Sequence, residues 1–593
     1  MRRLVPIVAA SLALLGASTA SAATGDLTFK DCVAKFATTN PTCSAVPGGV
    51  LEGGRDVAIS PDGRLIYFAA DDRNAVVGFT RSLADGSIAY AGCIESGSSG
   101  SCAHTPNNTM LAPNSLAFAP DGKTLYVATE TSDTVVRLSV GTGGALTYVN
   151  CVENNDALPD WGCAAEAAGM ETVFRVTVSP DGNSVYASSE PATLNHFSSA
   201  LAPVSCYAEV TVAGCPTQAE PLQAPHGLAV SPDGAHLYVT SVGRDAIRWF
   251  KREANGTLTG GGCVADDDDQ TAFSDNCSEE STVDYNWLKH VAFSPDGTDA
   301  YVPDETSLGA IYHFTRNPTT GALTRQDCIA EDVNVDAPGC TELNDATGSG
   351  LHDATDAVVS PDSANLYVIG RSDALNTFSL ASPSGTMTFI RCLRSNEVQG
   401  CTGLGSAGVL DGPNGVAISP DGHDLYVANR AGVPALLHFE REAPGTRPGE
   451  EEPGPEEPGP GTGGGSGSGG SGSGGTGGGS GGGSGGGSTP VPKCNGLKAT
   501  KVGTAQADTI KGTQKRDVIA AGAGNDKVQS LAGKDVVCGE GGNDQLGGGP
   551  DADTLLGGPG KDTVKGAGGA DRMVGGPGKD TLLGGPGKDS VKQ

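Results

Sequence analysis

Residues 57–67 read Val-Ala-Ile-Ser-Pro-Asp-Gly-Arg-Leu-Ile-Tyr: a short apolar run, a Ser-Pro-Asp-Gly turn, and a second apolar run that ends in tyrosine. An Asp-Gly turn between two such runs is typical of a tight connection between two β-strands. The pattern or a near variant recurs with its turns beginning at Ser60, Ala119, Ser179, Ser231, Ser294, Ser360 and Ser419. The tyrosines of these seven copies fall in one column: Tyr67, Tyr126, Tyr186, Tyr238, Tyr301, Tyr367 and Tyr426.

Each copy continues into a third strand and, in most copies, a fourth strand that ends in cysteine. Four strands repeated about every 60 residues predict a propeller blade with long loops. The segment 27–32 matches the fourth strands of later copies, whereas the last copy stops after its third strand. We therefore expect the N-terminal strand to complete the seventh blade, because this closes the ring and leaves no large exposed sheet edge. The alternative, a linear array of seven units, does not explain why the N-terminal strand is of the kind that the last copy lacks.

The 16 cysteines follow the same repeat, with one close pair in each copy and two cysteines left in the C-terminal region. Local pairing is the simplest of many connectivities in an exported protein, and each bridge would brace the loop between two blades. Zinc binding is the competing interpretation, but the pairs lack Cys-x-x-Cys spacing and histidine partners. The expected pairs are Cys32/Cys43, Cys93/Cys102, Cys151/Cys163, Cys206/Cys215, Cys263/Cys277, Cys328/Cys340, Cys392/Cys401 and Cys494/Cys538.

The two ends and one internal tract divide the chain of 593 residues into four parts. Residues 1–22 have the basic, apolar and small-residue parts of a secretory signal peptide, with cleavage expected after Ala22. Residues 443–493 are rich in Pro and Glu and then in Gly and Ser, which predicts a disordered linker. The predicted domains are the propeller, 23–442, and a C-terminal domain, 494–593. No apolar stretch reaches the roughly 20 residues that a transmembrane helix needs.

The net charge of −31 lies almost entirely on the propeller, because residues 494–593 carry 13 basic and 12 acidic side chains. This acidity argues against nucleic acid or an anionic membrane as a partner. By the same argument, any substrate of the propeller is expected to be neutral.

The repeats resemble the lactonase-like, YVTN-type seven-bladed propellers, for which Ser-Pro-Asp-Gly followed by Leu-Tyr-Val is the hallmark. The resemblance covers about residues 27–442 and implies the fold. It does not imply one activity, because that family includes sugar-lactone hydrolases, muconate-cyclising relatives and many surface proteins. The cysteine pair in every blade is a departure from the cytosolic lactonases.

From residue 508 onward, an aspartate recurs every nine residues, and an apolar residue follows each aspartate two places later. The fullest copies, such as residues 557–564, fit the nonapeptide Gly-Gly-x-Gly-x-Asp-x-U-x, where U is apolar. This closely resembles the calcium-binding repeats of repeats-in-toxin proteins, which implies a parallel β-roll with U residues inside and Ca²⁺ between Gly-rich loops. The resemblance assigns two rows of ligands: Asp526, Asp544, Asp562 and Asp580 in one, and Asp535, Asp553, Asp571 and Asp589 in the other.

Two features qualify the calcium assignment and leave one alternative open. The loops before Asp508 and Asp517 are poor in glycine, so we expect these first coils to be metal-free caps. A lysine directly precedes four of the candidate ligands, which should weaken cation binding. The alternative is a metal-free solenoid in which the aspartates only make turns.

Polar residues recur at the ends of the first two strands, which meet around the central channel of a propeller. Before the Ser-Pro-Asp-Gly turns stand Arg55, Asn114, Arg175, His226, His290, Asp356 and Asn414, and four places after the column tyrosine stand Asp71, Glu130, Glu190 and Glu305. These residues could serve as acid/base groups or metal ligands. They could equally pair with one another and hold the loops, and no nucleophile–base arrangement is recognisable, so catalytic residues stay unassigned.

The sequence thus predicts an all-β protein: a seven-bladed β-propeller and a parallel β-roll joined by a Gly/Ser linker. The predicted function is a secreted, calcium-binding extracellular or surface-associated module for an unknown carbohydrate or protein ligand. The competing hypothesis is a secreted lactonase-like hydrolase of a neutral sugar lactone or related carbohydrate.

Overall fold

The structure is a computed structural model of the whole chain. It describes residues 25–37, 43–97, 102–155, 161–190, 192–215, 222–266, 277–280, 285, 287–306, 309–331, 340–343, 350–395, 401–404, 409–442, 493–494, 497–498, 501–503, 508–522, 524–539, 542–558, 560–576 and 579–592. The signal peptide and, apart from Lys493, the predicted linker lie outside the described residues. The chain forms two compact units, which divide between Gly454 and Pro455.

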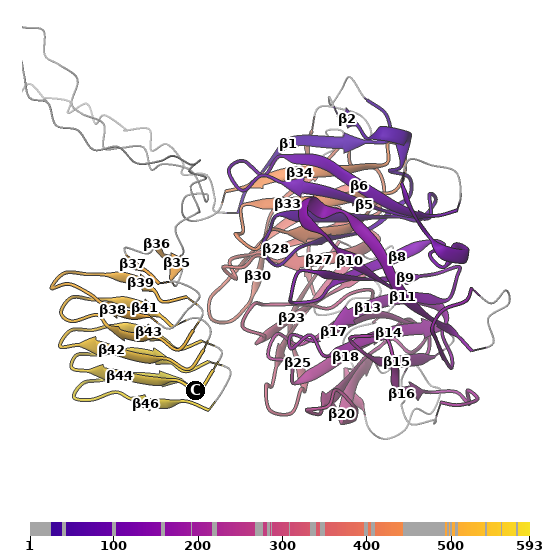
Figure 1. Ribbon diagram of the computed structural model, residues 1–593. Coiled ribbons are helices and arrows are strands. Elements are labelled where there is room, and N and C mark those ends of the chain that lie inside the picture. The colour runs from indigo at the N-terminus through magenta and orange to yellow at the C-terminus, as the bar shows by residue number, and fades with distance from the viewer. Residues whose placement is uncertain are drawn as a thin grey trace, which may run out of the picture. The chain divides into compact units, whose positions relative to one another are not determined.

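The N-terminal unit is an all-β ring of seven sheets (Figure 1), as expected from the seven repeats. Sheets one to three contain β3 (Gly54–Ile59), β4 (Leu65–Ala70), β5 (Ala75–Arg81), β6 (Ile88–Ser96) and β7 (Ala103–Thr105); β8 (Pro113–Phe118), β9 (Thr124–Thr129), β10 (Thr134–Val140), β11 (Leu146–Asn154) and β12 (Ala165–Ala167); and β13 (Glu171–Val178), β14 (Ser184–Glu190), β15 (Thr193–Ser198) and β16 (Pro203–Ala208).

Sheets four to six contain β17 (Pro225–Val230), β18 (His236–Ser241), β19 (Ala246–Arg252), β20 (Leu258–Asp266) and β21 (Cys277–Glu280); β22 (Ala292–Phe293), β23 (Asp299–Asp304), β24 (Ala310–Arg316), β25 (Leu323–Ala330) and β26 (Thr341–Glu342); and β27 (Ala354–Val359), β28 (Asn365–Gly370), β29 (Ala374–Leu380), β30 (Met387–Arg394) and β31 (Cys401–Gly403). Four short 3₁₀ turns lie at Pro47–Gly49, Pro106–Asn108, Thr142–Gly144 and Val242–Arg244.

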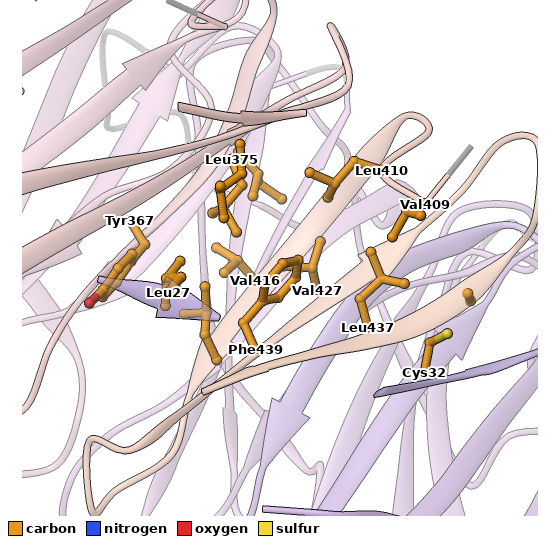
Figure 2. Close-up of a cluster of buried hydrophobic side chains, with 14 of the residues drawn as sticks. Leu27, Cys32, Tyr367, Leu375, Val409, Leu410, Val416, Val427, Leu437 and Phe439 are labelled. Carbon is orange, nitrogen blue, oxygen red and sulfur yellow. The ribbon is translucent and has the colours of Figure 1, made fainter. Parts of the chain in front are cut away.

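The seventh sheet confirms the predicted closure of the ring. Its order is β32 (Pro413–Ile418), β33 (Asp424–Asn429), β34 (Ala435–Arg441), β1 (Leu27–Ala34) and β2 (Ser44–Ala45). The N-terminal strand β1 pairs antiparallel with β34, so that Leu27 lies opposite Arg441. Figure 2 shows Leu27 packed in one apolar cluster with Phe439, Val416 and Tyr367.

The blades differ from the expectation of four strands, because six of the seven sheets have a fifth strand at the outer edge. This strand begins at the second cysteine of the pair or one to two residues after it, and it runs parallel to the fourth strand; Cys392, for example, lies opposite Cys401. The third sheet has four strands among the described residues. The extra strand covers part of the outer edge, which would otherwise expose unpaired backbone groups.

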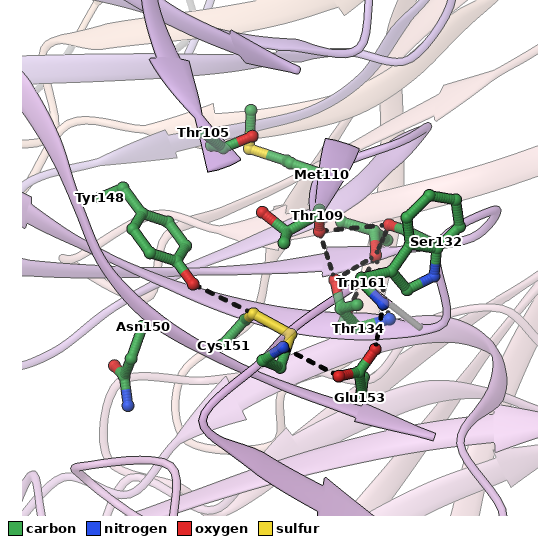
Figure 3. Close-up of a disulfide and its surroundings, with 12 residues drawn as sticks. Thr105, Thr109, Met110, Ser132, Thr134, Tyr148, Asn150, Cys151, Glu153 and Trp161 are labelled. Atoms are coloured by element: carbon green, nitrogen blue, oxygen red, sulfur yellow. Dashed lines mark hydrogen bonds between the residues drawn. A yellow bond between two sulfur atoms is a disulfide. The ribbon is translucent and has the colours of Figure 1, made fainter. Parts of the chain in front are cut away.

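All eight disulfides that we expected from local pairing are present. In the second blade, Glu153 accepts hydrogen bonds from the backbone N–H groups of Trp161 and Cys163, both at 2.8 Å (Figure 3). Tyr148 lies with its hydroxyl 3.1 Å from the sulfur of Cys151. The seven bridges of the propeller each close a loop of 9 to 14 residues and so reduce the entropy of the unfolded chain, whereas Cys494–Cys538 spans 44 residues.

The column tyrosines join each blade to the next. Each donates its hydroxyl hydrogen to a backbone carbonyl in the following blade; Tyr367 bonds to Gly25 O, beside β1, and Tyr426 closes the ring by bonding to Gly86 O in the first blade. A buried arginine at the end of a third strand also reaches back to the tyrosine and turn aspartate of the preceding blade at four of the seven junctions. These are Arg81, Arg252, Arg316 and Arg441.

The C-terminal unit is a two-sheet solenoid in which every pairing between coils is parallel. One sheet contains β37 (Lys501–Val502), β39 (Val518–Ala520), β41 (Val536–Cys538), β43 (Thr554–Leu556), β45 (Arg572–Val574) and β47 (Ser590–Lys592). The other contains β38 (Thr509–Lys511), β40 (Lys527–Gln529), β42 (Gln545–Gly549), β44 (Thr563–Ala567) and β46 (Thr581–Leu583).

The interior of the solenoid is the predicted column of apolar U residues, including Ile519, Val537, Leu555 and Met573. A hairpin of β35 (Lys493–Cys494) and β36 (Leu497–Lys498) precedes the coils. Cys494 forms a disulfide with Cys538, which lies in β41, the third strand of the first sheet. The predicted parallel β-roll is therefore confirmed.

Candidate functional sites in the channel and in the roll

The first strands of the seven blades surround a central cavity of about 490 Å³. Four ionisable side chains line it: Asp56, Arg175, His290 and Asp356. Both aspartates join neighbouring blades, because Asp56 accepts the N–H of Leu116 at 2.8 Å and Asp356 accepts that of Val416 at 3.1 Å. These two carboxylates therefore have a clear structural role.

Each carboxyl group inside the channel lies close to a basic side chain. Arg175 lies 3.7 Å from Asp56, and Nδ1 of His290 lies 3.6 Å from Asp356. Burial raises the pKa of Asp356 to about 6, although nearby Arg175 opposes the shift. Burial and Arg175 together lower the pKa of His290 to about 3. His290 is consequently neutral at pH 7.

A second cavity, of about 250 Å³, lies at the mouth formed by the strand ends. Seven residues that the sequence placed at this mouth line it: Arg55, Asn114, Glu130, Arg175, His226, Glu305 and Asn414. His290 and Asp356 line the inner cavity instead, whereas Asp71 and Glu190 line neither. Phe174, Trp287, Lys289, Thr355 and Arg371 complete the mouth.

The mouth carboxylates are paired with cations. Glu305 contacts Arg371 and lies 2.6 Å from Lys289, while Glu130 lies 3.5 Å from Arg55. Four cationic side chains and two carboxylates line the mouth, so its local charge is opposite to that of the whole domain. The net charge of the domain therefore does not exclude an anionic ligand at this position.

His226 is the strongest candidate for an acid/base group at the mouth. Its ring stacks on Phe174 with 4.1 Å between the centroids, and its Nδ1 lies 3.1 Å from the ammonium of Lys289. Burial, followed by Lys289, lowers the pKa of His226 to about 3. A base this weak removes protons poorly at neutral pH, because efficient general bases have a pKa near the working pH.

Three of the mouth residues that the sequence analysis missed had a visible signal. Arg371 occupies the same column, four places after the tyrosine, that contains Asp71, Glu130, Glu190 and Glu305. Phe174 and Lys289 directly precede Arg175 and His290. Following each column through all seven blades, whatever the residue type, would have found them.

In the roll, aspartates eighteen residues apart form two hydrogen-bonded ladders. The backbone N–H of each donates to Oδ1 of the aspartate in the next coil; Asp544 N to Asp562 Oδ1 is 2.8 Å. The rows run from Asp508 to Asp580 and from Asp517 to Asp589. They bring together all eight predicted ligands: Asp526, Asp544, Asp562 and Asp580 in one row, and Asp535, Asp553, Asp571 and Asp589 in the other.

The second oxygen of these aspartates fits a cation. Oδ2 is buried without a hydrogen-bond partner in Asp526, Asp535, Asp544, Asp553, Asp562 and Asp571. A Cβ on Gly557 would lie closer than 3.0 Å to both Asp562 Oδ2 and the carbonyl oxygen of Gly575 in the next coil. Glycines 539, 548 and 566 have the same surroundings, which gives four cradles of a carboxylate and a carbonyl oxygen. Hard oxygen donors of this kind are the ligands that Ca²⁺ prefers.

Side chains alone would not complete such a site. Among the described residues, no three His, Cys, Asp or Glu side chains converge in a way that could hold a metal ion. A cation in a cradle must therefore take several ligands from backbone carbonyls, which the Gly-rich loops supply. At Asp517, in contrast, the N–H and hydroxyl of Thr513 both donate to Oδ2. This arrangement agrees with the expectation that the first coils are metal-free.

Without a bound cation, the negative charge of the cradle carboxylates is energetically unfavourable. Burial, with repulsion from neighbouring aspartates, raises the pKa of Asp544 to about 6 and that of Asp553 to about 7. Since the folded pKa exceeds the unfolded one, the calcium-free roll loses stability as the pH rises from about 4 to about 7.

Comparison with protein families agrees with both parts of the fold. Residues 196–399 match the family described as lactonase, 7-bladed beta-propeller. Segments 502–537, 511–546, 523–555, 547–582 and 556–591 match the RTX calcium-binding nonapeptide repeat. The chain contains a lactonase-type propeller and calcium-binding-type repeats. A search of curated proteins found no match.

Many solved structures match this chain, and three of them are 10–16% identical to it. The periplasmic gluconolactonase of Pseudomonas aeruginosa is 16% identical, with a TM-score of 0.41 over 59% of this chain and 86% of that one. The hydrazine synthase of Kuenenia stuttgartiensis is 15% identical, with a TM-score of 0.41 over 65% and 95%. The Swd1 propeller domain of Myceliophteria thermophila is 10% identical, with a TM-score of 0.43 over 66% and 97%.

Proposed function

We propose that this protein is a secreted binding module, extracellular or attached to a cell surface, with a propeller tethered to a calcium-stabilised roll. The observation that carries the calcium part is the set of buried Oδ2 atoms without hydrogen-bond partners, each row facing Gly-rich loops. The proposed ligands are Asp526, Asp535, Asp544, Asp553, Asp562, Asp571, Asp580 and Asp589.

The proposal of secretion is supported by the N-terminal signal-like segment and by the eight disulfides, which persist in oxidising compartments. No helix among the described residues is long and apolar enough to cross a membrane. The binding role is supported by the mouth: its cavity is polar, its carboxylates are paired, and its central histidine is a weak base. The proposed ligand is a carbohydrate or a protein.

Adding a single methyl group tests the calcium cradle. Gly557→Ala should fill the space beside Asp562 Oδ2 and weaken calcium binding by the roll at least about tenfold at that site, or about 1.4 kcal/mol. Calorimetric titration of the full chain measures this effect. Gly547→Ala is the matched control, because its Cβ would meet the nearest atom only at 3.6 Å, an ordinary contact. Equal calcium binding by both variants and the wild type would contradict the cradle.

The second candidate function is hydrolysis of a neutral sugar lactone or related carbohydrate by the propeller. The contact between His226 and Lys289 inside a cavity favours it, since a neutral imidazole there meets a buried ammonium. We expect no turnover when a panel of sugar lactones is assayed. If the wild type turns over a lactone and a folded His226→Gln variant does not, the propeller is an enzyme and the proposed binding role is wrong.

A further inference from the structure

The surface of the roll is strongly basic although its net charge is close to zero. Ten of its twelve acidic residues belong to the aspartate ladders, where eight are buried and Asp508 and Asp589 are half-buried. Among the described residues of the roll, Asp551 is the one fully exposed acid. The exposed cations are Lys511, Lys515, Arg516, Lys527, Lys534, Lys561, Lys565, Arg572, Lys579 and Lys588.

One face of the roll presents part of this charge on a regular surface. In the sheet of β38, β40, β42, β44 and β46, the U residues point inward and the residues on either side of them point outward. The strand pairing aligns the outward residues in two columns: Lys511, Gln529, Gly547, Lys565 and Leu583, and Thr509, Lys527, Gln545, Thr563 and Thr581. We call these ten residues the lysine face. It contains no acidic residue.

We propose that the lysine face binds a linear acidic polysaccharide, one that has carboxylates along its chain. Lys511 and Lys565 lie three coils apart in one column, or about 14 Å at the strand spacing of a sheet, and Lys527 lies in the other column. A polymer that runs along the columns meets these ammonium groups in turn. The amides of Gln529 and Gln545 and the threonine hydroxyls between them offer donors and acceptors for sugar hydroxyls.

The composition of the face favours a polysaccharide over other anions. It has no aromatic side chain on which the bases of a single-stranded nucleic acid could stack. Leu583 is its single large apolar residue, which is too little for insertion into a membrane. Calcium should strengthen the binding, because each ion in a cradle adds two positive charges to the roll and orders the coils that form the face. In this respect the inference rests on the proposed function.

Binding of the full chain to immobilised hyaluronan in calcium and low salt tests the proposal. We expect the wild type to bind, and the triple variant Lys511→Gln, Lys527→Gln, Lys565→Gln to bind at least about tenfold more weakly, because charge contacts dominate such binding. The control triple variant Lys515→Gln, Arg516→Gln, Arg572→Gln loses the same charge elsewhere on the roll. It should stay within about twofold of the wild type.

Several results would overturn the proposal. These are absence of wild-type binding, equal loss in both triple variants, equal binding to neutral dextran, or equal binding to DNA. Self-association that only the lysine-face variant abolishes would assign the face to the acidic propeller of a second copy. Calcium binding is measured on the same samples. If the lysine-face variant still binds calcium but no longer binds hyaluronan, the result supports the lysine face as the binding site. If the wild-type chain binds no calcium, the result contradicts the proposed function.

Discussion

Replacing Arg441 by methionine is expected to destabilise the propeller by about 3–5 kcal/mol, the usual result of removing one partner from a buried ion pair. The guanidinium is 1% exposed and donates to both oxygens of Asp362 at 2.9 Å, to the hydroxyl of Tyr367 at 2.8 Å and to Gly422 O at 3.1 Å. Methionine keeps much of the volume but removes the hydrogen bonds and the charge that the guanidinium gives to these buried groups. Because the bonds join the last two blades, the loss should weaken the junction beside the closing strand.

Chemical denaturation followed by tryptophan fluorescence measures this change. Arg430→Met is the control, since Arg430 lies in the same blade with a side chain that is 38% exposed and 3.6 Å from its carboxylate partner. We expect the control to cost less than about 1 kcal/mol, as exposed ion pairs do. Equal costs for the two variants would show that the arginines at the blade junctions do not stabilise the ring.

Removing calcium from the full chain is expected to unfold the roll and leave the propeller intact. Without cations, the ladders place buried carboxylates in neighbouring coils, about 4.8 Å apart. Calcium at a hundred times its dissociation constant stabilises the roll by about 2.7 kcal/mol for each independent site. The propeller contains seven of the eight disulfides, and its charged residues already form ion pairs.

Hydrogen exchange read by mass spectrometry separates the two units. Amides of residues 518–574 should exchange fast in chelator and slowly in millimolar calcium, while those of the propeller strands should not change. Asp562→Ala should move the transition to higher calcium. Asp508→Ala, in the Gly-poor first coil, should leave it in place. A roll that stays protected in chelator would support the metal-free solenoid.

The fold was predictable because its signals repeat. Seven copies of the tyrosine column, seven cysteine pairs and ten evenly spaced aspartates each specify the same position many times. The strand at 27–34 was predictable for a different reason: it supplies the strand that the last copy lacks. The fifth strands were not predictable, because segments such as Ala103–Thr105 are too short to show alternation and are held by a disulfide.

The side-chain contacts between blades could not be predicted from the sequence. Nothing local links Arg441 to Asp362, 79 residues earlier, and the pattern breaks at three junctions where Val140, Ser199 and Leu380 stand in the arginine position. At the first of these, Val140 packs in one apolar cluster with Leu65, at the position where Asp424 in the seventh blade contacts Arg81. The arginine bonds are thus shared by four junctions, whereas the tyrosine bond is present at all seven.

One of the two candidate sites could be predicted in detail from the sequence, and the other only as a region. The aspartate ladders follow from the nine-residue period, because it fixes which side chains stack. The mouth was placed correctly as a region, yet the pairing of Glu305 with Lys289 and Arg371 depends on how the fifth and sixth blades meet. The depressed pKa of His226 likewise arises from burial and a lysine 63 residues away, so the sequence could not show that this histidine is a weak base.

The most direct test of the account is to count the calcium ions bound to the full chain. Native mass spectrometry after equilibration in millimolar calcium should find at least four ions per chain, one for each cradle at Gly539, Gly548, Gly557 and Gly566. The same chain should have none after chelation. A chain with no bound calcium under these conditions would contradict the calcium-stabilised roll and, with it, the proposed module.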